Sequence, residues 1–279
     1  MIKKILVTTD FSIRAKTGLR FAIQLASQQD VELTFFYSYH LMKPTIWSDA
    51  DFASFKKIEA EKNLKKLHQY VDSIYKNKGI IPKNIKYVVK EGIFADSNIR
   101  EYALNNHFDF ICVSTRGAGY LKKILGTTTS SLINFSAVPI IAIPHNYRTT
   151  SIHKLLYLSD FTDVDNELEK VMDFAKPLGA KVILLHFNSP SEILDKTSKI
   201  AEAVKKYEKG SVDYYCKDLK KTDRLISKIN EYTTLYKPSL LIMFTKQNRG
   251  FIEKIFYGSQ SENYAFNAKV PLLVFNKMA

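Results

Sequence analysis

Residues 4–12 of the chain read KILVTTDFS, and residues 154–162 read KLLYLSDFT. In each stretch an apolar run ends in a small hydroxyl residue, an aspartate, a phenylalanine and a second hydroxyl residue. A continuous apolar run of this kind is typical of a β-strand that is buried on both faces, as in parallel sheets. One short match can arise by chance, so the rest of the chain decides whether it marks a repeat.

A second pair of stretches recurs in the same order. GTTTSSLINFSAVPIIAI (Gly126–Ile143) is similar to GSQSENYAFNAKVPLLVF (Gly258–Phe275), and in both the proline follows the first glycine by 13 residues. Two colinear matches with preserved internal spacing indicate a duplication. The polar, turn-rich stretch Asn146–Ile152 separates the two copies. We therefore expect two tandem domains, residues 1–147 and residues 152–279.

Each copy alternates strand-like runs with helix-like segments. We expect strands at residues 5–9, 31–39, 85–89, 108–114 and 138–143, and again at residues 155–159, 182–187, 212–216, 240–244 and 271–275. Between strands, apolar residues such as Leu19 and Ala22 recur at helical spacing. Ser12 is expected to cap the first helix, and Asp96 or Ser97 the third. This alternation predicts an α/β fold of two tandem open parallel five-stranded sheets with helices on both faces.

Composition excludes several classes of protein. The chain has 279 residues, of which 46% are hydrophobic and 25% charged, as in ordinary globular proteins and unlike collagen or disordered chains. No apolar run is long enough to span a membrane, and the first residues lack the apolar core of a signal peptide. Cys112 and Cys216 lie far apart and form no CxxC motif. We therefore expect a cytoplasmic protein without a disulfide framework and without a membrane partner.

The charge is strongly positive, at +13. Residues 1–148 carry a surplus of nine positive charges, and the remainder a surplus of four. A basic surface favours polyanionic partners. In the stretch Lys56–Tyr70, however, lysines interleave with Glu59 and Glu61, which is typical of a solvated helix face. On this pattern we do not expect a nucleic-acid partner, and we keep nucleic acid as an alternative.

Polar residues follow the first, second and fourth strands of the first copy. In an open parallel sheet, ligands bind at the carboxyl ends of the strands, so these residues are expected to converge. After the fourth strand, a glycine-containing segment leads into a helix start whose amides, dipole and hydroxyls suit a phosphate, and Arg116, Lys122 and Lys123 can add positive charge. The candidate binding residues are Thr9, Asp10, Ser38, Ser114, Gly117, Gly126, Thr127 and Thr128.

The aspartate after the first strand recurs as Asp10 and Asp160. Its carboxylate either contacts a ligand or accepts hydrogen bonds from backbone amides at the start of a helix. For Asp160 the structural role is favoured, because the second copy does not repeat the glycine-containing segment that follows the fourth strand of the first copy. For Asp10 both interpretations stay open.

Signatures of catalysis are missing from the sequence. It contains no GxxxxGK[ST] phosphate loop, no GxSxG elbow, no set of kinase motifs and no HIGH sequence. Its six histidines form no HExxH, HxH or Cys/His cluster, so we expect no metal site. These observations favour a protein that is not an enzyme.

The layout resembles tandem members of the universal stress protein family. The resemblance rests on Thr9-Asp10-Phe11-Ser12, Gly117, Gly126-Thr127 and Val138-Pro139 in the first copy, and on Ser159-Asp160-Phe161-Thr162, Gly258-Ser259 and Val270-Pro271 in the second. It implies a Rossmann-like fold of the adenine-nucleotide alpha-hydrolase type and a regulatory role in the stress response. It also implies that Asp10 lies at the adenine edge and that Gly117, Gly126 and Thr127 lie at the triphosphate.

The sequence departs from the family motif, G-x-x-G, nine residues, then G-[ST]. Ser114 stands at the first glycine position of the first copy, and only eight residues separate Gly117 from Gly126. In the second copy, counting back from the glycine of GSQ places Thr245 and Asn248 at the two glycine positions, and Phe244 would narrow the cleft. We expect ATP or another adenine nucleotide in the first domain only, or no ligand at all. The alternatives are a weak ATPase or nucleotidyl-transfer enzyme on the same scaffold, or a nucleic-acid-associated protein.

The fifth strand of each copy is apolar and, by the resemblance, an edge strand that pairs antiparallel across a two-fold axis. An exposed apolar edge in a soluble protein needs to be covered. We expect the strands at Pro139–Ile143 and Pro271–Phe275 to pair within one chain as an intramolecular pseudo-dimer. This pairing leaves a further homodimer open.

Overall fold

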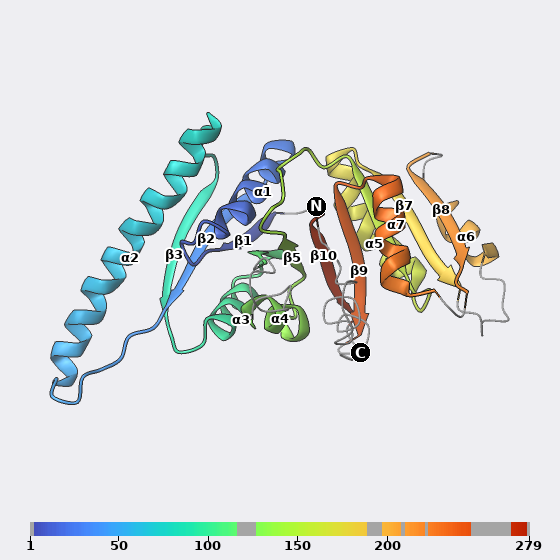
Figure 1. Ribbon diagram of the computed structural model, residues 1–279. Coiled ribbons are helices and arrows are strands. Elements are labelled where there is room, and N and C mark those ends of the chain that lie inside the picture. Colours follow the sequence, from blue (N-terminus) through green and yellow to red (C-terminus); the bar gives the residue numbers. More distant parts are fainter. Residues whose placement is uncertain are drawn as a thin grey trace. The chain divides into compact units, whose positions relative to one another are not determined.

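The computed structural model describes residues 3–115, 127–188, 197–207, 210–220, 223–246 and 269–277. The described residues up to Thr149 form one compact unit, and those from Thr150 onward form a second. We call them the N-terminal unit and the C-terminal unit (Figure 1). The apolar strands indicated by the sequence lie in the core of each unit. Ile5, Leu6 and Val7 are fully buried in the first, and Leu155, Leu156 and Tyr157 in the second.

The N-terminal unit alternates strands and helices along the chain. Its elements are β1 (Lys4–Thr8), α1 (Ala15–Gln28), β2 (Glu32–Tyr39), α2 (Asp49–Lys78), β3 (Ile85–Glu91), α3 (Ala95–Asn105), β4 (Phe110–Ser114), α4 (Thr127–Phe135) and β5 (Ile140–Ile143). The strand order is β3-β2-β1-β4-β5, and each neighbouring pair is parallel. Because the order reverses at β1, the carboxyl ends of β1, β2 and β4 form the topological switch point of this sheet.

Helices cover both faces of this sheet. Alternate residues of β2 point to opposite faces, so Phe35 packs against Tyr75 of α2 and Phe36 against Tyr102 of α3. Both phenylalanines are completely buried. The expected α/β class, with open parallel sheets and helices on both faces, is thereby confirmed for this unit.

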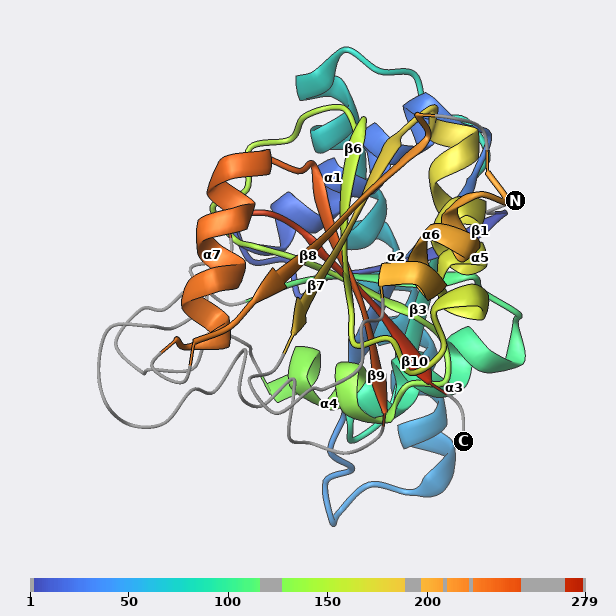
Figure 2. The same ribbon diagram turned by 90° about the vertical axis from the view of Figure 1, so that its right-hand side faces the viewer.

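The C-terminal unit repeats this path. Its elements are β6 (Lys154–Ser159), α5 (Val164–Ala175), the 3-10 turn η1 (Lys176–Leu178), β7 (Lys181–Asn188), α6 (Thr197–Val204), β8 (Val212–Asp218), α7 (Leu225–Tyr236), β9 (Leu240–Lys246) and β10 (Leu272–Lys277). The strand order is β10-β9-β6-β7-β8, again with parallel pairs. Figure 2 shows α7 on one side of β7 and β8, with α5 and α6 on the other.

Two helix starts test the predicted caps. The residue at the N-cap position of α1 is Arg14 and not Ser12, and its side chain makes no capping hydrogen bond. Ser12, two residues earlier, still accepts a hydrogen bond from Ala15 N at 3.1 Å through its Oγ. The expected cap of the third helix is wrong, because α3 begins at Ala95 and no side chain caps it. Asp96 lies inside its first turn, where its carboxylate accepts the hydroxyl of Ser131 in α4. The carboxylate therefore joins two helices instead of capping one.

Candidate functional site

A pocket of the N-terminal unit opens at the carboxyl ends of β1, β2 and β4. Six of the eight predicted site residues line it, and they are Thr9, Asp10, Ser38, Ser114, Thr127 and Thr128. The parallel pairing of β1 with β2 and with β4 brings these residues together from distant parts of the sequence. Gly117 and Gly126, and the cations Arg116, Lys122 and Lys123, lie outside the described residues.

The turn after β1 shapes one wall of the pocket. Asp10 Oδ1 accepts a hydrogen bond from Ser12 N at 2.9 Å, and Thr9 Oγ1 accepts one from Phe11 N at 3.0 Å. These bonds hold Phe11 in the left-handed region, with φ of 60°. The carboxylate of Asp10 thus has the structural role foreseen for it, while the residue also lines the pocket. Both interpretations of Asp10 are compatible with this geometry.

The same turn recurs in the C-terminal unit. Asp160 Oδ1 accepts from Thr162 N at 3.0 Å, Ser159 Oγ accepts from Phe161 N at 3.1 Å, and Phe161 has φ of 61°. A bulky residue rarely adopts this conformation. Ring packing offsets the strain in each copy: the Phe11 ring lies 4.4 Å from that of Tyr37, and the Phe161 ring 3.8 Å from that of His186.

Ser114 lines the pocket, but its hydroxyl is bound to α1. Ser114 Oγ accepts from Gly18 N at 2.8 Å and donates to Ala15 O at 3.1 Å. A Cβ on Gly18 would lie 2.6 Å from this oxygen, so the glycine gives the serine its room. The side chain that replaces the motif glycine therefore stabilises the start of α1. The sequence alone did not reveal this partner, which is 96 residues away along the chain.

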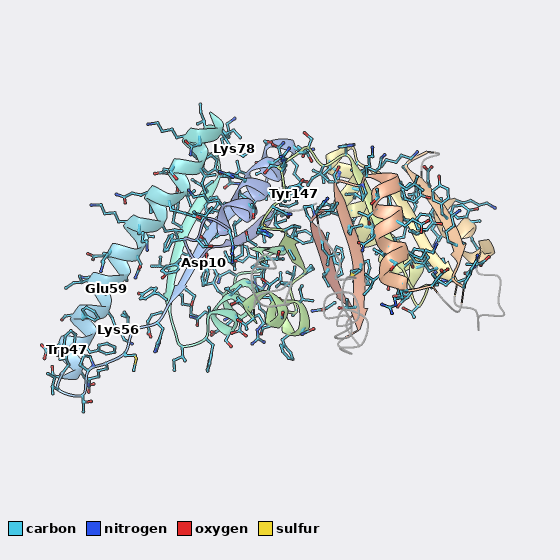
Figure 3. The ribbon with its side chains drawn as sticks, viewed as in Figure 1. Asp10, Trp47, Lys56, Glu59, Lys78 and Tyr147 are labelled. Atoms are coloured by element: carbon cyan, nitrogen blue, oxygen red, sulfur yellow. The ribbon has the colours of Figure 1, made fainter. Side chains whose placement is uncertain are left out.

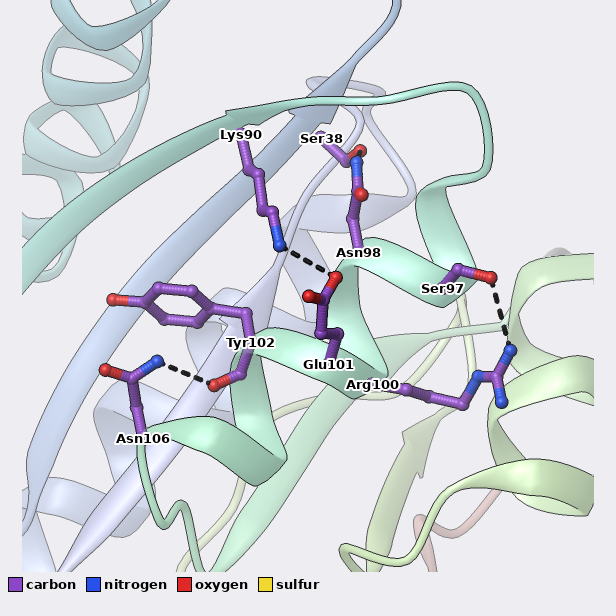
Figure 4. A network of polar contacts seen from close by, with 8 residues as sticks. All are labelled: Ser38, Lys90, Ser97, Asn98, Arg100, Glu101, Tyr102 and Asn106. Carbon is purple, nitrogen blue, oxygen red and sulfur yellow. Dashed lines mark hydrogen bonds and ion pairs between the residues drawn. The ribbon is translucent and has the colours of Figure 1, made fainter.

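Ser38 is held from the side of α3. Asn98 is buried, and its Nδ2 donates to Ser38 Oγ at 2.7 Å. Figure 4 shows the two side chains end to end, within a band of polar contacts along α3. A Cβ on Gly92 would come within 2.5 Å of the Asn98 amide. Because Asn98 supplies the donor, the hydroxyl hydrogen of Ser38 stays available to a ligand. Sequence reasoning missed Asn98, because it falls within an ordinary helical pattern.

The start of α4 closes the pocket with three threonines. Thr127, Thr128 and Thr129 all line it, and buried Thr129 donates its hydroxyl to Ser114 O at 3.4 Å. The first amides of a helix have no partner within the helix and carry a partial positive charge, which suits an anion. Arg14 also lines the pocket and has no ion-pair partner among the described residues. The sequence pointed to cations after β4, and it missed this arginine at the start of α1.

In the C-terminal unit, a bulky side chain stands at the strand position that corresponds to Ser114. The register pairs Cys112 with Val7 in β1 and Ile242 with Tyr157 in β6, so Phe244 occupies the position of Ser114. The assignment of Thr245 to that position is therefore wrong by one residue. Counting back from the later glycine fails because the two copies differ in the length of the loop after this strand. Phe244 is buried, and its ring lies 5.7 Å from that of Tyr157.

A buried polar cluster lies next to Phe244. The Tyr157 hydroxyl donates to Glu167 Oε2, and Ser159 Oγ lies 3.1 Å from the same hydroxyl. All three residues are buried. Burial, followed by the charge of Glu167, raises the pKa of Tyr157. His186 Nδ1 lies 2.8 Å from Ser159 O. A buried carboxylate and a phenyl ring in this region disfavour a phosphate.

Other reactive groups form no site in the described part of the chain. Cys112 is completely buried, and this burial raises the pKa of its thiol, which disfavours the reactive thiolate. Cys216 is half-buried. Across the described residues, no three His, Cys, Asp or Glu side chains gather as metal ligands would. None of the described helices combines the length and apolar character needed to cross a bilayer.

The comparisons with known proteins bear on the family and the fold of the chain. A model of the universal stress protein family matches residues 1–144. A search of curated proteins gave no match. Among solved structures, the chain is similar to a universal stress protein from Archaeoglobus fulgidus DSM 4304, with 22% identity, 98% of each chain covered and a TM-score of 0.71. It is also similar to the functionally unknown protein PA1789 from Pseudomonas aeruginosa PAO1, with 13% identity, 99% of this chain and 92% of that chain covered, and a TM-score of 0.56.

Proposed function

The chain belongs to the universal stress protein family, and from this premise we propose that its N-terminal unit binds an adenine nucleotide, such as ATP, in the pocket at the ends of β1, β2 and β4. The protein then acts as a nucleotide-responsive regulator in a stress response. The observation that carries the proposal is the convergence of Thr9, Asp10, Ser38 and the start of α4 on one pocket. Fold alone does not define function, so the argument rests on these side chains.

The polar groups of the pocket are of two kinds. Asp10 and Ser38 can hydrogen-bond a base or a ribose, while the α4 amides and Arg14 favour phosphates. The first set comes from the ends of β1 and β2, and the second from the starts of α4 and α1. This division suits a ligand that carries a hydrogen-bonding ring at one end and an anion at the other.

We propose that the C-terminal unit binds no nucleotide. Phe244 stands where the N-terminal unit has Ser114. Its ring contacts that of Tyr157, whose hydroxyl is bound to the carboxylate of Glu167. The side chain of Phe244 packs between Tyr157 and Phe275, with its ring 4.7 Å from that of Phe275. A nucleotide would have to displace this packed ring and approach a buried acid.

The chemistry of the pocket favours binding over catalysis. Among its described lining residues, Asp10 is the single carboxylate, and no histidine, cysteine or lysine is present. Asp10 already accepts a backbone amide, which weakens it as a general base. Hydrolysis of ATP by the purified protein, above the uncatalysed rate, would support the alternative of a weak ATPase.

The repeat supplies a matched pair of variants to test nucleotide binding. We expect Asp10→Ala to weaken ATP binding by about ten- to a hundredfold, the effect of losing one charge-assisted hydrogen bond of about 1.5–3 kcal/mol. Asp160→Ala removes the same turn from the C-terminal unit and should leave the affinity unchanged. Isothermal titration calorimetry with ATP measures both.

The stoichiometry of the titration decides between outcomes. One site per chain, weakened only by Asp10→Ala, supports the proposal. Two equal sites, or equal loss in both variants, would contradict the assignment to the N-terminal unit. If the wild-type protein releases no nucleotide in mass spectrometry and binds none in the calorimeter, the pocket has a structural role only.

We also propose that the fifth strands of the two units pair within one chain. Within its own unit β5 pairs with β4, and β10 pairs with β9, so each is the last strand in its order. Apolar edge strands aggregate unless they are paired or covered. The expected result is a monomer by light scattering, with slow hydrogen exchange at the β5 and β10 amides. Rapid exchange at both strands would contradict the pairing.

A further inference from the structure

Four cations gather on the outer surface of α1 and α2. Lys16 Nζ lies 5.7 Å from the centre of the Tyr70 ring, and Lys66 Nζ lies 4.3 Å from the centre of the Phe11 ring. Arg20 is close enough to Lys78 for its charge, after burial, to lower the pKa of that lysine. Figure 3 labels Lys78 at the C-terminal end of α2. We call the surface formed by Lys16, Arg20, Lys66, Tyr70, Ser73 and Lys78 the α1–α2 face.

The spacing of α2 explains why Lys66, Tyr70 and Ser73 share one side of the helix. Lys78 follows buried Ile74 and Tyr75 at helical spacing, and it joins the face at the end of α2, near Arg20. Lys66, Tyr70, Ser73 and Asn77 follow one another at steps of four, three and four residues, so they form one stripe along the helix. The Tyr70 hydroxyl donates to Ser12 O at 2.7 Å, which turns this stripe toward the start of α1. Lys66 to Lys78 spans 12 residues, or about 18 Å of helix.

The two helices hold few carboxylates beside the face. Asp10, which precedes α1, is close enough to Tyr70 for its charge, after burial, to raise the pKa of that tyrosine. Between them, α1 and residues 62–78 contain seven lysines or arginines and a single carboxylate, Asp72. Asp72 accepts the hydroxyl of Tyr87 on β3. Within the described part of the chain, Lys16, Arg20, Lys66 and Lys78 have no carboxylate within ion-pair distance. Like charges without counter-ions repel, and a polyanion would relieve this repulsion.

The internal repeat shows that the fold does not require a basic helix here. α5 follows the first strand of the C-terminal unit, as α1 follows that of the N-terminal unit. Four carboxylates lie along α5, at Asp165, Glu167, Glu169 and Asp173, whereas α1 has none. The corresponding helix of the C-terminal unit therefore accepts acidic residues. The fold itself does not require the basic residues of the α1–α2 face.

The other exposed groups on the face indicate the class of polyanion. Gln69, Ser73 and Asn77 are exposed and polar, and such side chains commonly contact phosphates and sugars. Insertion into a lipid bilayer would need apolar anchors. In α1 from Lys16 onward, and in residues 62–78, no described large apolar side chain is strongly exposed.

We propose that the α1–α2 face binds the phosphate backbone of a nucleic acid, without regard to sequence. None of the six residues that define it lines the nucleotide pocket, so this interaction is independent of the proposed function. A row of about 18 Å spans about five base pairs of duplex at a rise of about 3.4 Å. Up to four phosphates can then be neutralised, one for each cation.

The test compares two quadruple variants of the full chain with the same change in net charge. The first is Lys16→Gln, Arg20→Gln, Lys66→Gln and Lys78→Gln, which neutralises the face. The matched control is Lys170→Gln, Lys176→Gln, Lys205→Gln and Lys220→Gln, whose lysines are exposed in the C-terminal unit. Fluorescence anisotropy with a labelled duplex DNA of about 20 base pairs, between about 50 and 200 mM salt, gives the affinity and its salt dependence.

The expected result is a loss of about tenfold or more in affinity for the first variant. The slope of log affinity against log salt should fall by about 0.9 for each phosphate contact removed. The control should keep the wild-type slope, and circular dichroism checks that both variants fold. An equal loss in the two variants would overturn the proposal, since net charge alone would then explain binding. Wild-type protein that ignores DNA at about 50 mM salt, with or without binding to anionic vesicles, would overturn it as well.

Discussion

Gly18 and Ser114 depend on each other, although both look replaceable along the chain. A glycine inside a helix normally costs about 1 kcal/mol relative to alanine. Here the missing Cβ leaves space for Ser114 Oγ, which bonds Gly18 N and Ala15 O. The serine thus ties the first turn of α1 to the end of β4.

We expect Gly18→Ala to destabilise the N-terminal unit by about 1 kcal/mol. The added Cβ displaces Ser114 Oγ and breaks its two hydrogen bonds, worth about 0.5–1.5 kcal/mol each. This loss outweighs the gain in helix propensity from alanine. In a Ser114→Gly background, the same substitution should stabilise by about 1 kcal/mol, since the obstacle is gone. Urea denaturation of the four proteins in this cycle measures the coupling. Stabilisation by Gly18→Ala alone would show that the serine moves aside without cost.

At the scale of elements, α2 is anchored to the sheet by its C-terminal half. Leu67, Val71, Ile74 and Tyr75 are its buried residues, and the Tyr75 ring lies 6.2 Å from that of Phe35 in β2. Burial raises the pKa of Tyr75 to about 12, above the value of about 10 for a tyrosine in the unfolded chain. The folded state therefore favours the neutral phenol.

The sign of the pH dependence follows from this shift. The contribution of Tyr75 to stability is fully present below about pH 10 and is lost as the pH rises toward about 12, because only the unfolded chain ionises easily in that window. Tyr75→Phe should therefore reduce the loss of stability between pH 8 and pH 11 in urea denaturation, while Tyr214→Phe in β8 serves as the matched substitution in the other unit. An unchanged pH profile in Tyr75→Phe would contradict this account.

At the scale of the whole molecule, the chain consists of two compact units with different polar interiors. One has an open pocket at its strand ends, and the other has Phe244 and the Tyr157–Glu167 pair. A ligand stabilises only the unit that binds it, by RT ln(1 + [L]/Kd). Nucleotide binding and thermal stability are therefore linked in one unit alone.

In differential scanning calorimetry we expect two transitions, of which ATP at about a hundred times its Kd stabilises one by about 2.7 kcal/mol. Phe174→Ala removes a buried ring from α5 and should lower the other transition, which assigns it to the C-terminal unit. A single transition that shifts as a whole with ATP would show that the two units unfold together.

The repeat, the alternation of strands and helices, and the polar strand ends follow from the sequence by itself. Apolar runs identify strands buried on both faces, and a parallel sheet must bring their carboxyl ends to one edge. For this reason Thr9, Asp10 and Ser38 could be assigned to one site from residues that are distant in the chain. The start of α4, at Thr127, was assigned to the same site from its helix-start amides and hydroxyls, and the family resemblance assigned it to a triphosphate.

Only the tertiary structure decided which side chains meet across that edge. Ser114 bonds Gly18, Asn98 bonds Ser38, and Phe244 takes the position first given to Thr245. The cations of α1 and α2 likewise share a face that the interleaved charges of Lys56–Tyr70 concealed. The spacing of apolar residues along the sequence shows which face of a helix or strand is apolar, because that face is set by neighbouring residues. The pairing of one element with another depends on register and loop length, which local patterns do not contain.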